Sequence, residues 1–517
     1  PADYQGECAE RILTATTDAR LIAVDALSGE RCVSFGNLGE INLAIGMGND
    51  PLVFNFQTSP PGIVRGNAVV GGWVFDNRSV GEPSGVVRAF NAVTGSFAWA
   101  WDMGRPGINT EPLRGEVYTR GTPNVWSLFS VDEELGIIYA PTGNETPDYF
   151  GGHRMEVSEQ YASSIVAIDG ETGFPIWSYQ TTHHDIWDYD VPSQPVLIDL
   201  PGENGEKVPA VLVPTKRAEV FVLNRVTGEP LFDIQELPVP QDGAAPGEWV
   251  ANTQPFAVDL PHFRPDLSEA KMWGVTPLDQ LWCRIEFRKM RYEGHFTVPG
   301  IGTILQFPGN YGGHNWGSVS VDQVNNIMVV NPIVMANQLT LIPREELPQG
   351  VPGNQLGTPY SHTTVRFISP LDIPCQQPPY GVLAAVDLET RQLLWERPIG
   401  SARDTGPLGI PTGLPFNIGT PLTAGTVTTA GGLIFIAGTF DNTVRAVDLF
   451  SGEILWQDDI PYSSQGSPMS YLSPSGRQTI IVTAPVYNSN AASGSRVLPA
   501  AAEDPLGGYV FAYRLPD

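Results

Sequence analysis

The sequence predicts an all-β protein built from repeated antiparallel sheets, and three observations support that prediction. The chain of 517 residues contains 55 glycines and 47 prolines, a turn-rich composition that suits many short strands. Its hydrophobic content of 42%, with 10% aromatic residues, is sufficient for a large core and argues against disorder. The third observation is an element that recurs along the chain. A helical bundle would instead need long periodic segments rich in Ala, Glu, Lys and Leu.

In each copy of this element, apolar residues precede Asp or Asn, then two residues, Ser or Thr, Gly, three residues and an aromatic. Six copies occupy residues 21–33, 87–99, 165–177, 220–232, 383–395 and 444–456. The pattern predicts a β-hairpin in which the Asp or Asn side chain bonds its own downstream backbone and Gly takes a positive φ. The aromatic residue is expected to dock between neighbouring units. Val33 replaces it in the first copy, and Arg391 replaces Gly in the fifth.

Seven or eight four-stranded units of this size make a β-propeller, with repeated sandwiches as the alternative. A regular docking aromatic favours radial packing. We therefore predict a single domain over residues 1–517, an eight-bladed β-propeller whose first blade is incomplete. The long gap between the fourth and fifth copies should hold a degenerate unit near residues 318–331. The apolar segment 509–515 should be a strand that pairs with the N-terminus and closes the ring.

The charge balance excludes one class of partner. Acidic residues outnumber Lys and Arg by 56 to 29, for a net charge of −27, whereas nucleic-acid binding needs basic clusters. No run of about 18 apolar residues is present, so no membrane span is predicted. The chain begins at Pro1 without a signal peptide, as expected of a processed or truncated product.

The four cysteines bear on the redox environment. Cys8, Cys32, Cys283 and Cys375 form no CxxC or CxxCH motif, which argues against covalent haem attachment and a cysteine-rich zinc site. Pairing them to close the smaller loops gives Cys8–Cys32 and Cys283–Cys375. Two disulfides would indicate an oxidising compartment, and four free thiols are the alternative.

Two features between the repeats have the residue types of a reactive site. His183, His184 and Asp185 precede Asp188 and Asp190, but adjacent histidines on an extended segment face opposite ways and do not share a zinc ion well. Beside Trp187, Asp188 is either a desolvated base or a structural turn residue.

Lys216 is the second feature. It lies in an apolar segment of a chain with few lysines, so its ammonium requires an anionic partner. A salt bridge and a bound anionic ligand both remain open.

Long motifs make the chain resemble the dehydrogenases that depend on pyrroloquinoline quinone (PQQ), above all the periplasmic domain of membrane-bound glucose, quinate and polyol dehydrogenases. The resemblance covers essentially the whole chain. It is strongest in TPNVW, PTGNETPDYFGGHR, SYQTTHHDIWDYDVPSQPV, PTKRAEVFVLNRVTGEP, MRYEGHFTVPG and GGLIFIAGTFDNTVRAVDLFSGEILWQ.

The resemblance implies a PQQ- and Ca²⁺-dependent oxidation of a substrate hydroxyl. Trp126 corresponds to the indole beneath the planar quinone. Glu82, Asn144 and Asp188 correspond to oxygen ligands of Ca²⁺, which accepts such a set in flexible geometry. Asp188 is also the expected general base, accepting the hydroxyl proton while hydride moves to C5 of the quinone.

Further cofactor contacts follow from the same resemblance. Lys216 corresponds to a catalytic lysine that reaches the quinone oxygens, and Glu82 and Asn331 to residues that bind the cofactor. His183 and His184 are expected to orient the site from behind rather than to bind metal.

Departures from the family pattern bear on substrate and acceptor. The adjacent-cysteine disulfide of simple-alcohol enzymes is absent, and residues 484–505 lack the His of the glucose enzymes' GGHG-type loop. A polyol or cyclic polyol is therefore favoured over glucose or a simple alcohol. Electrons are expected to pass to ubiquinone or another separate acceptor in the periplasm, with a membrane-anchor subunit or segments outside this chain as a further expectation. The alternative from another class is a cofactor-free propeller scaffold.

Overall fold

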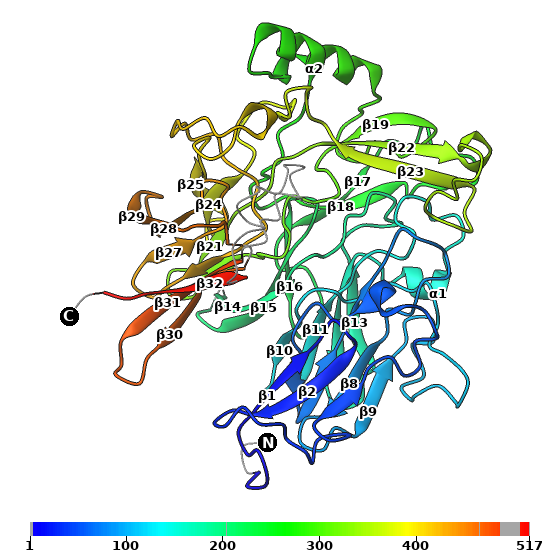
Figure 1. Cartoon of the computed structure of the whole chain (residues 1–517), viewed down its shortest axis with the longest axis vertical. Coiled ribbons are helices and arrows are strands. Elements are labelled where there is room, and N and C mark those ends of the chain that lie inside the picture. The colour runs from blue at the N-terminus through cyan, green and yellow to red at the C-terminus, as the bar shows by residue number, and fades with distance from the viewer. Residues whose placement is uncertain (1–3, 203, 465, 486–506, 516–517) are drawn as a thin grey trace.

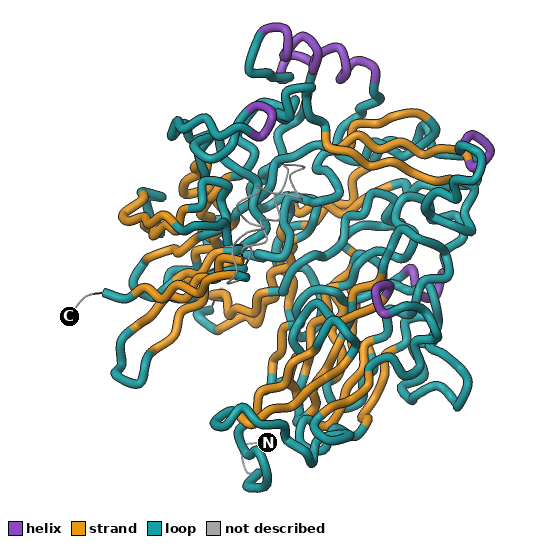
Figure 2. Tube along the Cα trace, viewed as in Figure 1, coloured by secondary structure: helices purple, strands orange, loops and turns teal. Residues whose placement is uncertain are grey.

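The computed structural model describes residues 4–202, 204–464, 466–485 and 507–515. Strands and loops dominate this part of the chain, as Figure 2 shows, so the predicted all-β class is confirmed. The described strands form ten antiparallel sheets, of which eight have three or four strands. No described helix is long and apolar enough to cross a membrane.

Three sheets precede residue 181 and contain the first three repeats. Their strands are β1 (Arg11–Ala15), β2 (Arg20–Asp25) and β3 (Glu40–Asn42); β5 (Gly62–Val64), β6 (Asn67–Val70), β8 (Val87–Asn91) and β9 (Phe97–Trp101); and β10 (Ser130–Asp132), β11 (Ile137–Pro141), β12 (Ser164–Asp169) and β13 (Pro175–Gln180).

Four more sheets continue the series. Their strands are β14 (Val196–Pro201), β15 (Lys207–Pro214) and β16 (Val220–Asn224); β20 (Ser320–Asp322), β21 (Ile327–Val330), β24 (Val382–Asp387) and β25 (Gln392–Pro398); β26 (Thr426–Thr428), β27 (Leu433–Ile436), β28 (Thr443–Asp448) and β29 (Ile454–Asp459); and β30 (Met469–Leu472), β31 (Gln478–Pro485) and β32 (Gly508–Tyr513). Figure 1 shows these sheets following one another in an arc from blue to red.

The remaining elements are insertions between these sheets. They are β4 (Asn55–Phe56) with β7 (Trp73–Val74); β17 (Ile234–Pro238) with β18 (Thr253–Ala257); β19 (Gly302–Gln306), β22 (Asn337–Pro343) and β23 (Tyr360–Arg366); the helices α1 (Glu156–Glu159) and α2 (Pro277–Lys289); and the 3₁₀ turns η1 (Leu52–Phe54), η2 (Glu269–Lys271), η3 (Arg344–Glu346) and η4 (Pro407–Gly409). In Figure 1, β19, β22 and β23 lie beside α2 at the outer end of the molecule. Because this sheet contains no repeat, the number of eight blades stays a prediction.

The repeat turns form as the sequence predicted. Oδ1 of Asp169 accepts the N–H of Glu171 and of Thr172, at 3.1 and 2.7 Å, and the Thr172 hydroxyl at 2.8 Å. Gly173 follows with φ of +76°. The side chains that accept the two backbone N–H groups in the other copies are Asp25, Asn91, Asn224, Asp387 and Asp448. Arg391, which replaces Gly, also takes a positive φ, of +61°.

Three of the five repeat aromatics dock against the next unit, which confirms the second expectation for these copies, whereas Trp456 is 40% exposed. Trp99 lies against Gly173 of the next repeat, where an added Cβ would approach its ring to 2.4 Å, and its Nε1 donates to Gly170 O at 3.1 Å. Trp177 and Trp395 contact the corresponding glycines, Gly228 and Gly452, in the same way. Each glycine is thus required twice, for its positive φ and for the close approach of an indole.

The structure contradicts two predictions, one about residues 318–331 and one about the C-terminal strand. The segment 318–331 is no separate unit, because β20 and β21 pair with β24 and complete the sheet of the fifth repeat. The C-terminal strand β32 pairs with β31, with Ile480 opposite Tyr513, and not with the N-terminal strand. β32 thus joins the strand that precedes it in its own sheet, and in Figure 1 the arc is open between β32 and β1.

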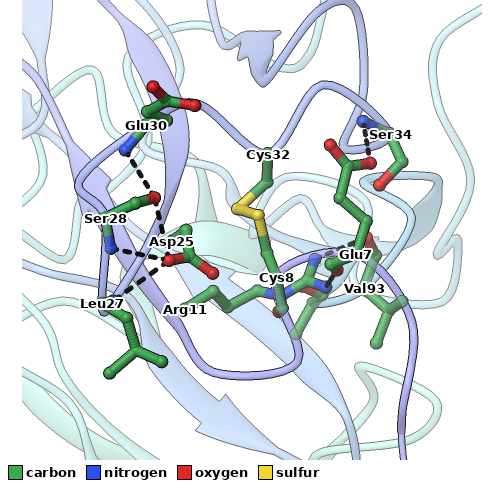
Figure 3. The surroundings of a disulfide bond; sticks show 11 residues. Glu7, Cys8, Arg11, Asp25, Leu27, Ser28, Glu30, Cys32, Ser34 and Val93 are labelled. Atoms are coloured by element: carbon green, nitrogen blue, oxygen red, sulfur yellow. Dashed lines mark hydrogen bonds between the residues drawn. A yellow bond between two sulfur atoms is a disulfide. The ribbon is translucent and has the colours of Figure 1, made fainter.

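Both predicted disulfides are present. Cys8 and Cys32 are bonded with their Cα atoms 5.8 Å apart, and Cys283 of α2 is bonded to Cys375 with a Cα separation of 5.3 Å. Figure 3 shows the first of them beside the turn of Asp25, and it closes a loop that contains β1, β2 and this turn. The second ties α2 to the segment after β23. No cysteine is left free for a thiol reaction or a metal.

Candidate active site

The segment between β13 and β14 contains the predicted base and is fixed by Asp185. Its buried carboxylate accepts the backbone N–H of Trp187 at 2.9 Å, that of Tyr189 at 2.6 Å and the Ser163 hydroxyl at 2.6 Å. Between those two N–H donors, Asp188 has a φ of +62°, a left-handed conformation that is uncommon outside glycine. The loop therefore holds Asp188 in one orientation.

Lys216 lies two residues beyond β15, in the turn that leads to β16, and its ammonium meets two carboxylates. Nζ is 2.6 Å from Oδ1 of Asp188 and 2.9 Å from Oδ2 of Asp190, and the residue is only 6% exposed. A salt bridge is thus one partner of this lysine, as the sequence had left open. Nζ also lies 5.8 Å from the centroid of the Trp126 ring.

Two further aspartates, Asp76 and Asp148, share this site and were missed from the sequence. Burial raises the pKa of Asp76 to about 8, and the charges of Asp188 and Asp190 add to that rise while Lys216 opposes it. Burial also raises the pKa of Asp148 and of Asp188 well above the ordinary value. We call Asp76, Asp148, Asp188 and Asp190 the carboxylate cluster. Four acidic groups in it face a single ammonium.

Asp76 and Asp148 are joined to each other through Asn77. The Asn77 amide nitrogen donates to Oδ2 of Asp148 at 2.5 Å, and the Asp148 N–H donates to Oδ1 of Asn77 at 3.3 Å. Both aspartates are far from Asp188 in the sequence, and no motif links them to it. The sequence shows only that each lies beside hydrophobic residues, Asp76 in VFDN and Asp148 in TPDYF.

Trp126 and Asn144 reach the cluster through Asp190, as expected for residues of one site. Trp126 Nε1 donates to Oδ2 of Asp190 at 3.2 Å, and the Asn144 N–H donates to Oδ1 at 2.6 Å. The Asn144 side chain donates to the Asp185 carbonyl at 2.8 Å. The Trp126 ring is only partly buried and meets the edge of Trp316, with centroids 4.7 Å apart. An aromatic surface is therefore available beside the Lys216 ammonium.

Glu82, predicted to bind both cation and cofactor, has different partners. Its buried carboxylate accepts Arg78 at 3.0 Å and the Ser79 hydroxyl at 3.0 Å. Among the described residues it makes no hydrogen bond or ion pair with Asn144 or Asp188. The structure therefore does not join the three predicted ligands through hydrogen bonds or ion pairs among the described residues, and the roles of Glu82 stay predictions.

The two histidines also differ from expectation. His183 is at the surface, with Nδ1 2.8 Å from Gln180 Oε1 and Nε2 3.0 Å from Glu236 Oε1. It has no contact that would orient Asp188. His184 is buried between Glu159 and Glu248, and although burial opposes the change, these two carboxylates raise the pKa of His184. Asp185, the third member of the motif, is the residue that orients Asp188.

Asn331 lies at the end of β21 and has half of its amide unpartnered. Its Nδ2 donates to the Ala424 carbonyl at 3.0 Å, whereas its buried Oδ1 has no donor among the described residues. A buried acceptor without a donor is costly, so it indicates a ligand at this position.

The donor chemistry fits the expected cofactor and cation in different degrees. An exposed indole face, a buried ammonium and an unpartnered amide oxygen suit a planar anionic quinone. The excess of carboxylate charge suits a divalent cation with oxygen ligands. In the described part of the chain, however, no three Asp, Glu, His or Cys side chains converge as a ready-made metal site.

Comparison with known proteins shows the family to which the chain belongs. Residues 1–480 match the PQQ glucose/ethanol/alcohol dehydrogenase β-propeller domain. The glycerol dehydrogenase large subunit of Gluconobacter oxydans is 42% identical over 92% of this chain and 67% of its own length. The quinate/shikimate dehydrogenase (quinone) of Acinetobacter baylyi is 41% identical over 98% of this chain and 63% of its own. The quinoprotein glucose dehydrogenase of Escherichia coli is 41% identical over 100% and 64%.

Solved structures support the fold. A europium-containing methanol dehydrogenase superimposes with a TM-score of 0.63 at 19% identity, over 99% of this chain and 80% of its own. The quinohemoprotein alcohol dehydrogenase of Comamonas testosteroni gives a TM-score of 0.62 at 22% identity, over 92% and 62%. The chain spans about two thirds of the length of the curated relatives it matches.

Proposed function

The chain belongs to the family of PQQ-dependent dehydrogenases, and we propose that it oxidises a hydroxyl group of a polyhydroxy substrate at the site around Asp188. The observation that supports this proposal is the buried pair of Asp188 and Lys216 beside the partly exposed ring of Trp126. When bound, PQQ supplies the acceptor for the hydride that leaves the carbinol carbon. A scaffold without a cofactor would have no use for this costly arrangement of buried charges.

Asp188 is the proposed general base. Its raised pKa, due first to burial, makes it a stronger proton acceptor than an ordinary carboxylate. The bonds from Trp187 and Tyr189 to Asp185 hold its backbone, and the ammonium of Lys216 holds Oδ1, which leaves Oδ2 for the substrate hydroxyl. Lys216 thereby orients Asp188 and opposes the rise of its pKa.

Trp126 and Asn331 are the proposed contacts of the cofactor. The indole face of Trp126 offers a platform for the planar ring system, and the free Oδ1 of Asn331 offers an acceptor for an N–H group. Lys216 adds a positive charge next to Trp126, which favours an anionic quinone.

We further propose that Ca²⁺ binds to the carboxylate cluster. Asp76, Asp148 and Asp188 are the candidate ligands among the described residues, with Asp76 in the role that we had expected of Glu82. Such a cation would neutralise the excess of negative charge and polarise an oxygen bound next to Asp188.

The cellular context is also proposed. Two disulfides favour an oxidising compartment such as the periplasm. One relative is named a quinone-linked enzyme and another a large subunit, which supports ubiquinone or a separate acceptor and a membrane-anchor subunit as partners.

Reconstitution tests the proposal. Protein loaded with PQQ and Ca²⁺ should reduce an artificial dye in the presence of glycerol, sorbitol, arabitol, inositol, quinate or glucose. Asp188→Asn should lower kcat by about 10²–10⁴-fold because the base is lost. Asp266→Asn, at an exposed position, is the matched control and should keep full activity. Absence of quinone absorbance after reconstitution, or an active Asp188→Asn protein, would contradict the proposal.

A further inference from the structure

A cavity of about 240 Å³ lies between the insertion sheet β19–β22–β23 and the segments that precede β26 and follow β27. One wall is formed by Asn310 and Tyr311, and another by Thr364 and Arg366 at the end of β23. No Asp or Glu is found among the described residues that line it, although the chain has 56 acidic residues. The described lining therefore has a net positive charge, whereas the whole chain has a net charge of −27.

Arg366 supplies the only charge among the described residues of this lining. Its Nη1 is buried and has no acceptor among the described residues. Arg88 also has one unpartnered nitrogen, Nε, but the rest of its guanidinium donates to the carbonyls of Ile45 and Leu43, and Arg344 donates to a set of backbone carbonyls. The guanidinium of Arg366 donates no hydrogen bond among the described residues, and a buried N–H without an acceptor is costly, so it favours an acceptor from outside the described part of the chain.

Arg366 remains a cation under ordinary conditions. Burial lowers the pKa of Arg366 to about 10, and the nearby phenol of Tyr311 opposes that change. At neutral pH the guanidinium is therefore protonated. No acidic group is among the charges that shift it, so the cavity presents positive potential to a ligand.

The wall that contains Tyr311 is connected to Lys216 through the residues that follow Tyr311 in the chain. The next residue, Gly312, packs so closely on Lys216 that a Cβ would lie 2.6 Å from its Cγ, and the Gly313 N–H donates to the Lys216 carbonyl at 2.6 Å. Burial raises the pKa of Tyr311, and both Arg366 and Lys216 oppose that rise, so the phenol lies within electrostatic range of both cations.

The wall that contains Thr364 is connected to the carboxylate cluster through Tyr149. Its hydroxyl is 3.1 Å from Nδ1 of His362 and is hydrogen-bonded to the hydroxyl of Tyr149. Tyr149 is buried, and its ring contacts that of His362 at a tilt of 56° with centroids 4.6 Å apart. The charge of Asp188 adds to the burial that raises the pKa of Tyr149. The cavity and the carboxylate cluster are therefore joined by two short chains of contacts.

We propose that Arg366 binds a carboxylate of the substrate in this cavity, so that the enzyme prefers a polyhydroxy acid to a neutral polyol or sugar. This inference rests on the proposed function, because it places the second end of a substrate whose hydroxyl is at Asp188. A guanidinium recognises a carboxylate through paired charge-assisted hydrogen bonds, and a neutral polyol leaves that buried cation unmatched. PQQ also carries carboxylates and is the other source of the same group.

Two substrates that differ in a carboxylate test whether Arg366 binds the carboxylate of the substrate or that of PQQ. Quinate is a cyclic polyol with a carboxylate, and myo-inositol is a cyclic polyol without one. With the PQQ- and Ca²⁺-loaded protein, Arg366→Gln should lower kcat/KM for quinate by about 10–100-fold, mainly through KM, since a hydrogen bond to a charged group is lost. The value for myo-inositol should change by less than about twofold. Arg366→Lys keeps the charge and should retain part of the preference, and the exposed Arg397→Gln is the control.

Two binding measurements complete the test. Titration with PQQ, followed by tryptophan fluorescence, should give the same Kd for wild type and Arg366→Gln. A tenfold or larger rise in that Kd with an unchanged quinate preference would assign the carboxylate to the cofactor and overturn the proposal. Equal loss for quinate and myo-inositol would also overturn it.

If the loaded protein oxidises no substrate, the proposed function fails while this inference remains testable. Quinate should then still raise the Tm of the PQQ-loaded wild type and not that of Arg366→Gln. An absence of any such shift would overturn the carboxylate site itself.

Discussion

The molecule uses aspartate in opposite ways in two regions. The rim is the set of repeat turns, and the centre is the carboxylate cluster. At the rim, Asp448 accepts the hydroxyl and the N–H of Ser451, and these bonds lower the pKa of Asp448. At the centre, burial raises the pKa of Asp188. The rim carboxylate is stabilised as an ion by its own neighbours in sequence, whereas the central carboxylate is destabilised and depends on residues from other loops.

Because of this difference, we expect substitutions in the repeat turns to affect stability alone and substitutions in the carboxylate cluster to affect both stability and activity. A turn aspartate satisfies backbone N–H groups within three residues, so its loss should affect the local hairpin alone. In the carboxylate cluster, Asp188 and Asp190 share one cation, Lys216, as their ion-pair partner among the described residues, so a change at Lys216 should affect both. The two regions are therefore expected to respond differently to comparable substitutions.

The largest effect on stability is expected from Lys216→Ala. Removing the ammonium leaves Asp188 and Asp190 buried without their counter-charge, and the loss of one partner of a buried pair costs about 3–5 kcal/mol. The free energy of unfolding by urea should fall by that amount, and activity should be lost with it.

Lys271→Ala is the matched control, because its ammonium donates to the Asp266 carbonyl at the exposed surface. It should change the free energy of unfolding by less than about 0.5 kcal/mol. Adding Asp190→Asn to Lys216→Ala should recover part of the lost stability by removing one unpaired charge. Equal losses for the two lysines would contradict the central role of Lys216.

A smaller change in the free energy of unfolding is expected at acid pH, through the buried His314 and the half-buried His362. Burial lowers the pKa of His314 and of His362 to about 4. Below their unfolded pKa of 6.5, the unfolded chain binds protons that the folded chain does not, so stability falls as the pH drops from 6.5 towards 4. Each histidine contributes at most about 3 kcal/mol across that window, at 1.36 kcal/mol for each pKa unit.

Urea unfolding at a series of pH values measures this effect. His314→Gln and His362→Gln should each reduce the slope of the free energy of unfolding between pH 6.5 and 4, and the double variant should reduce it further. Above pH 7 the curves of all variants should run parallel to the wild type. An unchanged acid slope in the double variant would show that these two imidazoles are not kept neutral by the fold.

The same contrast explains what the sequence could predict. The turns, the docking tryptophans and the disulfide pairs follow from local spacing or from small loops, and all were predicted. Asp76, Asp148 and the cavity around Arg366 join loops that are far apart in the chain, so no spacing marked them. The roles of Glu82 stay predictions, because the structure shows only that Arg78 and Ser79 bond its carboxylate. The pairing of β32 depends on which edge is free, and the sequence has no signal for that.

The smallest effect is expected at the rim, from Asp169→Ala. Its carboxylate accepts two N–H groups and one hydroxyl, whereas Asp387, in the copy with Arg391, accepts two N–H groups and no hydroxyl from Thr390. At about 0.5–1.5 kcal/mol net for a hydrogen bond, with part of the set recovered by water, Asp169→Ala should cost about 1–2 kcal/mol and Asp387→Ala somewhat less. Both should leave kcat and KM unchanged, because each carboxylate accepts hydrogen bonds only from its own turn. A rim variant that lowers kcat while retaining its stability would show that the turns also position the centre, and the separation between the two regions would then have to be abandoned.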